Sequence, residues 1–405
     1  MISRISPLSS QNMKRKIFHC LALLFVILSF SACGALDDDE VYALDFSKSL
    51  SNGWNLGNTL DAKSDGDKTN KGLSTETLWG MPETTEAMIK AVYAKGFRTI
   101  RIPVSWHNHI TDSSFTIDSE WMARVKTVVD WSLAAGLKVI INIHHDNLSE
   151  SQMSSTYGFC ITSDSEKKAA SLSYIKSVWS QIAQTFKDYD NRLVFELLNE
   201  PRAVGTKYEW STGSYAAEVR AANVLIMEYE KAALDTIRAT GGNNLSRFIM
   251  IPPYAASPDM TAGWSLPKDS SKAPVSHLIV SVHAYTPYVF CMGTSSNKTF
   301  TNSTRDEIDW LFSGLNSNWV SNGTAVVIGE MSASDKNNTE DRSKWASYYG
   351  QKAKSNGIPV ILWDNMVRST ASGGNGSIES GECHGYFDRK NLSWWFEGIV
   401  KEIAK

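Results

Sequence analysis

Eight short apolar runs recur along this chain, and they constrain its fold more than any other feature. Most of their residues are β-branched or aromatic, and glycine, asparagine or proline bounds most of the runs. Such near-continuous apolar runs indicate parallel strands that are buried on both faces of a sheet. The runs occupy residues 53–57, 97–102, 137–143, 193–198, 248–251, 278–282, 325–328 and 358–363.

Amphipathic segments separate these runs and predict helices. Gly136, Gly241 and Gly357 each follow such a segment and precede an apolar run, as is typical of helix-to-strand loops. The alternation predicts an α/β fold and, with eight strands, a (β/α)8 TIM barrel forming a single catalytic domain. A doubly wound open sheet is the structural alternative. The expected helices occupy residues 83–94, 119–135, 166–189, 216–239, 304–315 and 341–355.

The first residues resemble a targeting segment rather than a part of the fold. A basic stretch at 14–16 precedes an apolar stretch at 17–30, which is shorter than the roughly 20 residues of a membrane-spanning helix. Serine and alanine then precede Cys33, and this ending resembles a bacterial lipobox, in which the cysteine is lipidated after cleavage. An ordinary secretory signal, with Cys33 incidental, is the alternative.

This interpretation divides the chain into a signal peptide over residues 1–33, a short acidic tether over residues 34–42 and a catalytic domain over residues 43–405. The domain is long enough for a barrel, which commonly needs roughly 250 residues. No long linker rich in proline, threonine or serine suggests a second domain. We expect export across the inner membrane and an outer-membrane or cell-surface lipoprotein, or otherwise an extracellular or periplasmic protein, with membrane contact only through the lipid anchor.

Composition and charge narrow the function classes. The net charge is -3, and no basic run follows the N-terminus, which argues against nucleic-acid binding. The 14 tryptophans exceed what a core needs and suit stacking on sugar faces. Four aromatic residues near strand-to-helix loops are open between core packing and substrate contact: Trp106, Tyr208, Trp210 and Trp264.

Cysteine usage and nucleotide motifs point to no cofactor. Cys160, Cys291 and Cys383 remain after the signal, and an odd number with no zinc-type spacing favours free thiols, with a single disulfide bridge as the alternative. Neither a nucleophile elbow nor a phosphate-binding glycine loop is present. The sequence therefore predicts an enzyme that works without a metal or a cofactor.

Polar residues end most of the expected strands. In a barrel, the chemistry lies at the C-terminal ends of the strands, so these residues are the candidates for the site. They are Asn58 and Asp61 after the first strand, Arg101, His144 and His145, Asn199 and Glu200, His283 and Tyr285, Glu330 and Trp363.

Glu200 and Glu330 are two carboxylates on different strands, which suits acetal hydrolysis. One acid protonates the leaving oxygen, while the second carboxylate attacks or stabilises the oxocarbenium-like transition state. The acid needs a raised pKa, through burial or the other carboxylate, and the nucleophile needs a cation, for which Arg101 is the candidate. Asn199 suits a sugar 2-hydroxyl, and Trp363 suits a sugar face.

His144 and His145 raise the alternative of a metal-dependent hydrolase. Adjacent histidines on a strand point to opposite faces, so we expect them not to share one ion. Glu196 has the same strand parity as Glu200 and lies one layer deeper. We expect it to be the structural partner of a buried cation.

The segment 193–202, Leu-Val-Phe-Glu-Leu-Leu-Asn-Glu-Pro-Arg, resembles the signature of glycoside hydrolase family 5, the cellulase family A. Further motifs occur in the order of that family across nearly the whole mature chain. They are Gly-Trp-Asn-Leu-Gly-Asn at 53–58, Arg101, the pair His144 and His145, His-Ala-Tyr at 283–285, Gly-Glu at 329–330 and Trp363. The opening motif and the segment 362–365 are most similar to the bacterial endoglucanase, lichenase and xyloglucanase branch.

The resemblance implies a retaining endo-β-1,4-glucanase acting on a β-glucan polysaccharide, with Glu200 as acid/base and Glu330 as nucleophile. It implies that Asn58 and Asp61 hold the next sugar. The other candidates would line the subsite of the cleaved sugar: Arg101, His144, His145, Asn199, His283, Tyr285 and Trp363. A xyloglucanase, lichenase or mannanase is the alternative within the family. A non-catalytic surface glycan-binding lipoprotein is the alternative outside it.

Overall fold

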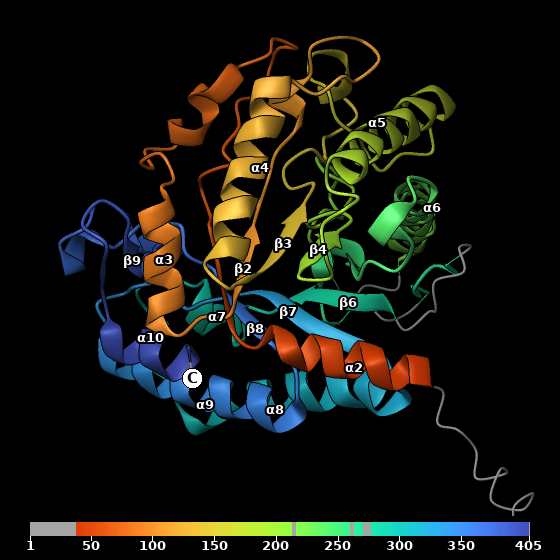
Figure 1. Cartoon of the computed structure of the whole chain (residues 1–405). Helices are drawn as coiled ribbons and strands as arrows, with labels where there is room; N and C mark the ends of the chain where they lie inside the picture. Colours follow the sequence, from red (N-terminus) through yellow and green to blue (C-terminus); the bar gives the residue numbers. More distant parts are fainter. Residues whose placement is uncertain (1–37, 213–215, 260–262, 270–276, 405) are drawn as a thin grey trace, which may run out of the picture.

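The structure, a computed structural model, describes residues 38–212, 216–259, 263–269 and 277–404 (Figure 1). The expected signal peptide and the lipidation site Cys33 lie outside these residues. Among the described helices, none has the length and apolar character needed to cross a membrane.

Eight parallel strands close into a barrel, which confirms the (β/α)8 prediction and removes the doubly wound alternative. Neighbours in sequence pair all the way round, and β1 pairs with β8 through Gly53 and Ile361. The eight strands coincide with the eight apolar runs. They are β1 (Gly53–Asn55), β2 (Thr99–Ile102), β3 (Lys138–Asn142), β4 (Leu193–Glu196), β5 (Ile249–Ile251), β6 (Leu278–His283), β7 (Ala325–Met331) and β8 (Val360–Leu362).

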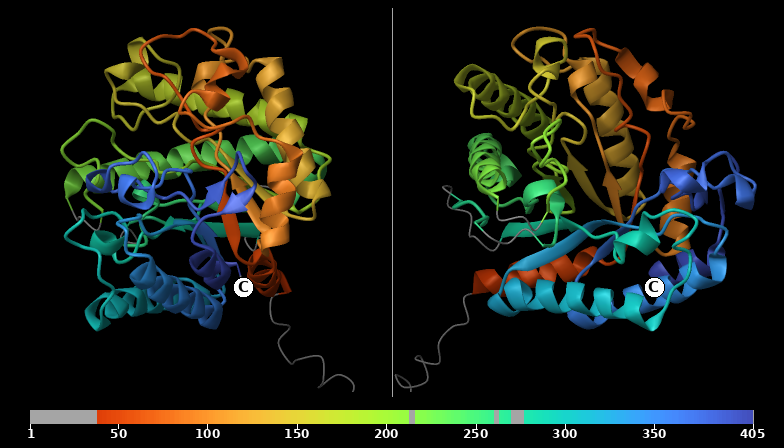
Figure 2. Two further views of the ribbon diagram at one scale, coloured as in Figure 1. Left: turned by 90° about the vertical axis from the view of Figure 1, so that its left-hand side faces the viewer. Right: turned by 180° about the vertical axis from the view of Figure 1, so that it is seen from behind.

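Helices surround the strands (Figure 2), and six of them match the expected segments. Local capping explains several starts: Asp118 accepts from the backbone amides of Glu120 and Trp121, and Asp164 accepts from Lys167. The six are α3 (Glu86–Lys95), α4 (Ser119–Ala134), α5 (Ser165–Thr185), α6 (Ala217–Ala239), α8 (Asn302–Asn318) and α9 (Thr339–Asn356). The structure adds α2 (Asp38–Leu50), α7 (Tyr288–Cys291), α10 (Glu397–Ile403) and a hairpin of β9 (Phe387–Asp388) and β10 (Ser393–Trp394).

Helix α2 covers the N-terminal end of the barrel (Figure 1). Ala43, Phe46 and Leu50 lie on one face of this helix and pack on apolar side chains inside the barrel, with the rings of Phe46 and Phe248 stacked at 3.6 Å. The helix begins at Asp38, inside the segment 34–42 that is expected to form a tether. The open end of an apolar barrel needs a cover, and this amphipathic helix supplies it.

Cys160, Cys291 and Cys383 are buried free thiols, as expected. Burial raises the pKa of Cys383 to about 11, and that of Cys291 is raised further still. These thiols are therefore unreactive near neutral pH and belong to the core.

Candidate active site

The inner wall of the barrel becomes polar near the C-terminal ends of its strands. Asn55, Arg101, Asn142, Glu196 and Ser281 come from five different strands, and all five are fully buried. Hydrogen bonds join them: Ser281 Oγ and Asn142 Nδ2 donate to Glu196 at 2.6 and 2.9 Å. This polar layer forms the floor of the candidate site.

Arg101 lies at the centre of this layer. Its Nε donates to Glu196 at 2.8 Å, its Nη1 donates to Glu330 at 2.7 Å, and its Nη2 donates to Asn199 Oδ1 at 2.7 Å. The expectation that Glu196 pairs with a buried cation is therefore confirmed. Because a guanidinium keeps its charge even when buried, Arg101 places a fixed positive charge against Glu330.

Glu330 is held by two donors. Strand β7 continues beyond residue 328, the end predicted from the sequence, and its pairing with β6 shifts register so that Glu330 lies opposite His283. Arg101 donates to its Oε1, and the hydroxyl of Tyr285 donates to its Oε2 at 2.7 Å. Both donors stabilise an ionised carboxylate, as a nucleophile requires.

Glu200 follows β4 and forms a close pair with His283. Its Oε1 lies 2.7 Å from His283 Nδ1, and 18% of its side chain is exposed. Burial alone would raise the pKa of Glu200, but the hydrogen bond and charge of His283, with the charge of Arg202, outweigh it and lower this pKa. The pKa of His283 is raised, because Glu330 and Glu200 outweigh the effect of its burial.

This direction corrects the expectation that the acid itself has a raised pKa. Strongly coupled groups titrate as a unit, so one proton is shared between His283 and Glu200. The pair therefore keeps a proton beside the cleft through the histidine rather than through burial of the carboxyl group.

The two carboxylates lie close together. One carboxyl oxygen of Glu200, one of Glu330 and a ring nitrogen of His283 all lie within 4.8 Å of one another. Retaining glycosidases separate their two carboxyl groups by about 5–5.5 Å, whereas inverting ones need about 6.5–9.5 Å to admit a water. The separation here fits direct attack by one carboxylate.

A second group of predicted residues forms one wall of the site. The rings of His144 and Trp363 are nearly parallel, at 5°, with centroids 6.0 Å apart. His145 lies edge-on to His144 at 4.4 Å and contacts Trp79 at 5.6 Å. Trp79 is 37% exposed and was not among the candidates from the sequence, although an aromatic residue in a strand-to-helix loop is a usable signal.

Asn58 and Asp61 lie in one turn after β1, but only the side chain of Asn58 is partly exposed to solvent. Asp61 is fully buried and accepts from the backbone amides of Asn58 at 3.0 Å and Thr59 at 2.6 Å. Burial raises the pKa of Asp61 to about 6. Asp61 therefore holds the turn that carries Asn58, which differs from the expectation that it contacts a sugar directly.

His144 and His145 lie beyond the end of their strand, so the expectation that they point to opposite faces is wrong. Strand β3 ends at Asn142, and Asp61, His144 and His145 each place one ligand atom within 4.8 Å of the others. The hydrogen bond between Asn142 and His144 argues against a metal ion bound by these three residues. Asn142 Nδ2 lies 3.1 Å from His144 Nδ1 and donates to it, with the amide orientation fixed by the bond from Nδ2 to Glu196.

The neutral ring of His144 therefore carries its proton on Nε2 and acts there as a donor. Burial, followed by the charges of His145 and Arg101, lowers the pKa of His144 well below its usual value, so the ring is neutral. Burial also lowers the pKa of His145, to about 3. A neutral donor of this kind suits a sugar hydroxyl better than a metal ion.

A cavity of about 440 Å³ opens beside Glu200. Trp210 and Tyr288 border it and are 60% and 69% exposed. Its lining residues are Glu200, Trp210, Thr212, Ala255, Ser257, Pro258, Asp259, His283, Ala284, Tyr285, Thr286 and Tyr288.

The exposure of the four aromatic residues shows which of them pack in the core and which border the cavity. Trp106 and Trp264 are buried, and their indole nitrogens donate to Asn142 O and to Glu230, respectively. Trp210 borders the cavity, whereas Tyr208 is half-buried and packs against the core.

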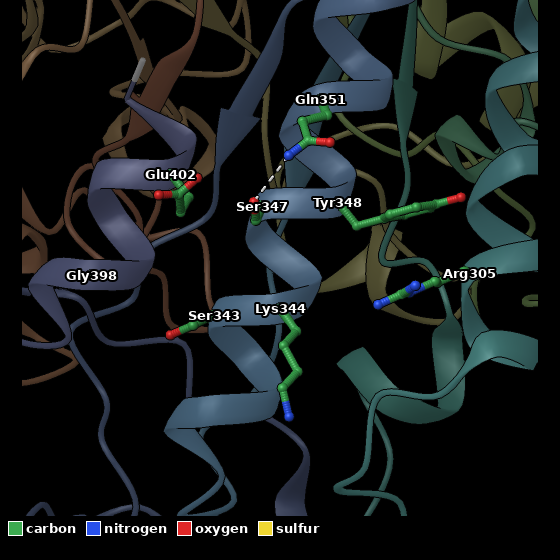
Figure 3. Close-up of a pocket in the computed structure, with 8 residues that line it drawn as sticks. All are labelled: Arg305, Ser343, Lys344, Ser347, Tyr348, Gln351, Gly398 and Glu402. Carbon is green, nitrogen blue, oxygen red and sulfur yellow. Dashed lines mark hydrogen bonds between the residues drawn. The ribbon is translucent and has the colours of Figure 1, made fainter.

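A larger groove, of about 590 Å³, lies away from this site between α8, α9 and α10 (Figure 3). Arg305, Lys344 and Tyr348 are among its lining residues, and Glu402 is the one carboxylate among them. It lacks the paired carboxylates that acetal hydrolysis needs, so the barrel mouth remains the candidate site.

Comparison with known proteins identifies the family of the chain. Residues 62–369 match the family described as cellulase (glycosyl hydrolase family 5). The chain is similar to endoglucanase A of Clostridium longisporum, with 41% identity over 359 residues, which cover 87% of this chain and 63% of that protein. The chain thus spans less than two thirds of the length of that relative.

Two solved structures are also similar. A lichenase from Caldicellulosiruptor sp. F32, solved with cellotetraose, has 40% identity and a TM-score of 0.80, with 89% of this chain and 94% of that chain covered. A xyloglucan-specific endo-β-1,4-glucanase from a metagenomic library has 33% identity and a TM-score of 0.77, with 90% and 99% covered.

Proposed function

Since the chain belongs to glycosyl hydrolase family 5, we propose that it is a retaining endo-β-1,4-glucanase that hydrolyses β-glucan polysaccharides. The observation that carries this proposal is the pair Glu200 and Glu330, whose carboxyl oxygens approach within 4.8 Å. Arg101 and Tyr285 hold one carboxylate, and His283 holds the other.

In the first step, a carboxylate oxygen of Glu330 attacks the anomeric carbon and forms a covalent glycosyl ester. The bond to the leaving sugar breaks, and Glu200 gives its proton to the departing oxygen. In the second step, Glu200 takes a proton from a water molecule, whose oxygen attacks the anomeric carbon and releases Glu330 as a carboxylate. Each step leaves atoms and charge balanced.

The neighbouring residues support these roles. Asn199 accepts from Arg101 through its Oδ1, which leaves its amide nitrogen to donate to a sugar 2-hydroxyl. Trp363 and His144 present flat rings at one wall, with His145 and Asn58 beside them for sugar hydroxyls. Asp61 acts through the turn that it holds.

An endo mode of action fits exposed aromatic residues around the carboxylates. Trp79 lies next to His145, and Trp210 borders the cavity beside Glu200. Similar proteins are named as a lichenase and as a xyloglucan-specific endoglucanase, so lichenan and xyloglucan join cellulose derivatives as substrates to test, with mannan as the remaining alternative.

The test is reducing-sugar release from carboxymethylcellulose, lichenan, xyloglucan and mannan, with Glu330→Ala as the inactive comparison. We expect turnover of at least one β-glucan by the wild type and a loss of about 10⁴-fold or more in the variant. Binding of these glycans without sugar release would support the non-catalytic glycan-binding alternative instead.

We also propose that the protein is a lipoprotein anchored through Cys33 at the outer membrane or cell surface. The motif at the end of the apolar stretch supports this proposal, and an extracellular or periplasmic soluble protein is the alternative. Labelling of expressing cells with a fatty-acid analogue tests it. We expect a labelled protein in the membrane fraction, and Cys33→Ser should abolish the label.

A further inference from the structure

Arg202 lies next to the proposed acid/base, and several hydrogen bonds fix its position. Its Nη1 donates to the backbone oxygen of Glu200 at 3.0 Å and lies 3.9 Å from Glu200 Oε2. Its Nε donates to Glu209 at 3.1 Å, and its backbone amide donates to Asn147 at 2.8 Å. These contacts fix a cation beside Glu200 without making it a direct partner of the carboxylate.

Trp210 stacks on the same guanidinium. The central carbon of Arg202 lies 4.0 Å from the centroid of the Trp210 ring, a cation–π geometry that covers one face of the indole. The residue still exposes 60% of its surface and borders the cavity that Glu200 lines. The indole is thus held from behind by Arg202 while part of it remains available to a ligand.

The chemistry assigns this cavity to one side of the scissile bond. In the proposed mechanism Glu200 protonates the leaving oxygen, so the leaving sugar lies on the side of Glu200. The cavity is lined by Glu200 and not by Glu330, which attacks the other sugar. Trp210 therefore borders the space of the leaving sugar in the first step, which is also the space of an acceptor in the second.

We propose that Trp210 and Arg202 form a clamp on this side, in which Trp210 stacks on the leaving or accepting sugar and Arg202 positions Glu200 for its two proton transfers. This inference rests on the proposed function. Arg202 is a positioning residue here, because it acts through Glu200 and not on the substrate.

The charges around Glu200 explain why such a residue is useful. Glu200 must be an acid in the first step and a base in the second. His283 supplies a proton, and Arg202 adds a positive charge that favours the ionised state required in the second step. Glu330, which lies within 4.8 Å of Glu200, and Glu382, which interacts electrostatically with both of them, oppose this effect.

Two substrates distinguish the contribution of Trp210 from that of Arg202. Cellotetraose places sugars on both sides of the scissile bond. The activated 2,4-dinitrophenyl β-cellobioside places no sugar on the leaving side, and its leaving group departs without a proton, so its turnover is limited by the second step. We expect Trp210→Ala to lower kcat/KM about tenfold on cellotetraose and clearly less on the aryl glycoside.

For Arg202→Met we expect the acid limb of the kcat profile on the aryl glycoside to move to higher pH. The sign follows because loss of a cation raises the pKa of Glu200, and the second step needs Glu200 ionised. Arg202→Lys should restore most of the wild-type profile. Added cellobiose should also give less transfer product relative to hydrolysis in Trp210→Ala.

Matched controls come from helix α8, away from the barrel mouth. Trp310 is 71% exposed, and Arg305 stacks on Phe300 and Tyr348, so Trp310→Ala and Arg305→Met test the same changes elsewhere. Equal losses on both substrates with an unmoved pH profile would overturn the clamp while leaving the hydrolase intact. A wild-type protein without turnover on any β-glucan would overturn both proposals.

Discussion

The Nδ1 atom of His283 lies 2.7 Å from Oε1 of Glu200, and both side chains are largely buried at the mouth of the barrel. At this distance the proton between them belongs to the pair, with the pKa of the histidine raised and that of the carboxyl group lowered. The proton donor of the site is therefore a two-residue unit, and its properties should change when either member changes.

Replacing His283 by glutamine should shift the pH profile. Without the imidazole, the pair loses the group that holds its proton, so the basic limb of kcat/KM on lichenan or another β-glucan should move to lower pH. The value of kcat at neutral pH should fall at least about tenfold, because less of the enzyme then carries the proton that the first step needs. Steady-state rates between pH 4 and 9, a range chosen to span the usual titration of histidine at about 6.5, test this prediction. An unmoved basic limb would speak against the shared proton.

Glu200→Ala should affect substrates according to their leaving groups. A polysaccharide needs a proton on its departing oxygen, so its hydrolysis should fall by about 10²–10⁴-fold. The dinitrophenyl glycoside needs no such proton, so its first step should proceed and release a burst of dinitrophenol. Glu330→Ala should give no burst with either substrate, because no glycosyl ester forms. Equal behaviour of the two variants would mean that the roles are assigned incorrectly.

Glu196 should matter for stability as well as for activity. It is fully buried and accepts from Arg101, Asn142 and Ser281. Glu196→Gln leaves the Arg101 cation with one carboxylate fewer in a buried layer, and breaking such a pair typically costs about 3–5 kcal/mol. Calorimetry should show a clearly lower Tm for this variant.

The control for this change is Glu340→Gln. Glu340 pairs with Lys344 on the surface of α9 at 2.7 Å, with 84% of its side chain exposed. An exposed pair contributes little to stability because water screens its charges, so Tm should hardly move. A Tm of Glu196→Gln that matches this control would show that the buried layer tolerates an unpaired guanidinium.

The sequence predicts the barrel and the strand ends because both depend on local patterns. Parallel strands that are buried on both faces leave continuous apolar runs, and the polar residue after each run lies at the same end of the barrel. The pairing of Glu196 with a buried cation also follows from strand parity, and the structure identifies that cation as Arg101.

Other features depend on contacts that no local pattern encodes. The register shift that places Glu330 opposite His283 arises from the pairing of β6 with β7, and the pKa of Glu200 depends on that histidine. Helix α2 has a recognisable apolar face only once the barrel end that it covers is known. His144 and His145 come together because the chain leaves β3 at Asn142, a boundary that sequence patterns locate poorly.

Removal of divalent metal ions should leave activity unchanged. Asn142 donates to His144 Nδ1, so His144 offers a donor at Nε2 where a metal would need a lone pair. Dialysis against EDTA, followed by an assay on carboxymethylcellulose, tests this expectation. Activity that disappears on dialysis and returns with added zinc would restore the alternative of a metal-dependent hydrolase at Asp61, His144 and His145.

His109 should make the fold sensitive to acid. It is fully buried, its ring stacks on Trp121 at 3.6 Å, and its Nε2 lies 3.1 Å from the hydroxyl of Thr75. Burial, followed by the charge of His107, lowers its pKa to about 3. In the unfolded chain its pKa is about 6.5, so the unfolded state binds the extra proton between these values. Stability is therefore lost as the pH falls through this window.

His109→Phe keeps the stacking and removes the titration. At pH 7 the variant should be slightly less stable than the wild type, because Thr75 loses a hydrogen bond of about 1 kcal/mol. At pH 4 it should be roughly 2 kcal/mol more stable than the wild type, because its folded state no longer has to exclude a proton that the unfolded state binds, and this gain exceeds the loss of the hydrogen bond. Calorimetric Tm values at both pH values provide the measurement. A difference in Tm between variant and wild type that is the same at pH 7 and at pH 4 would show that His109 does not drive the acid sensitivity.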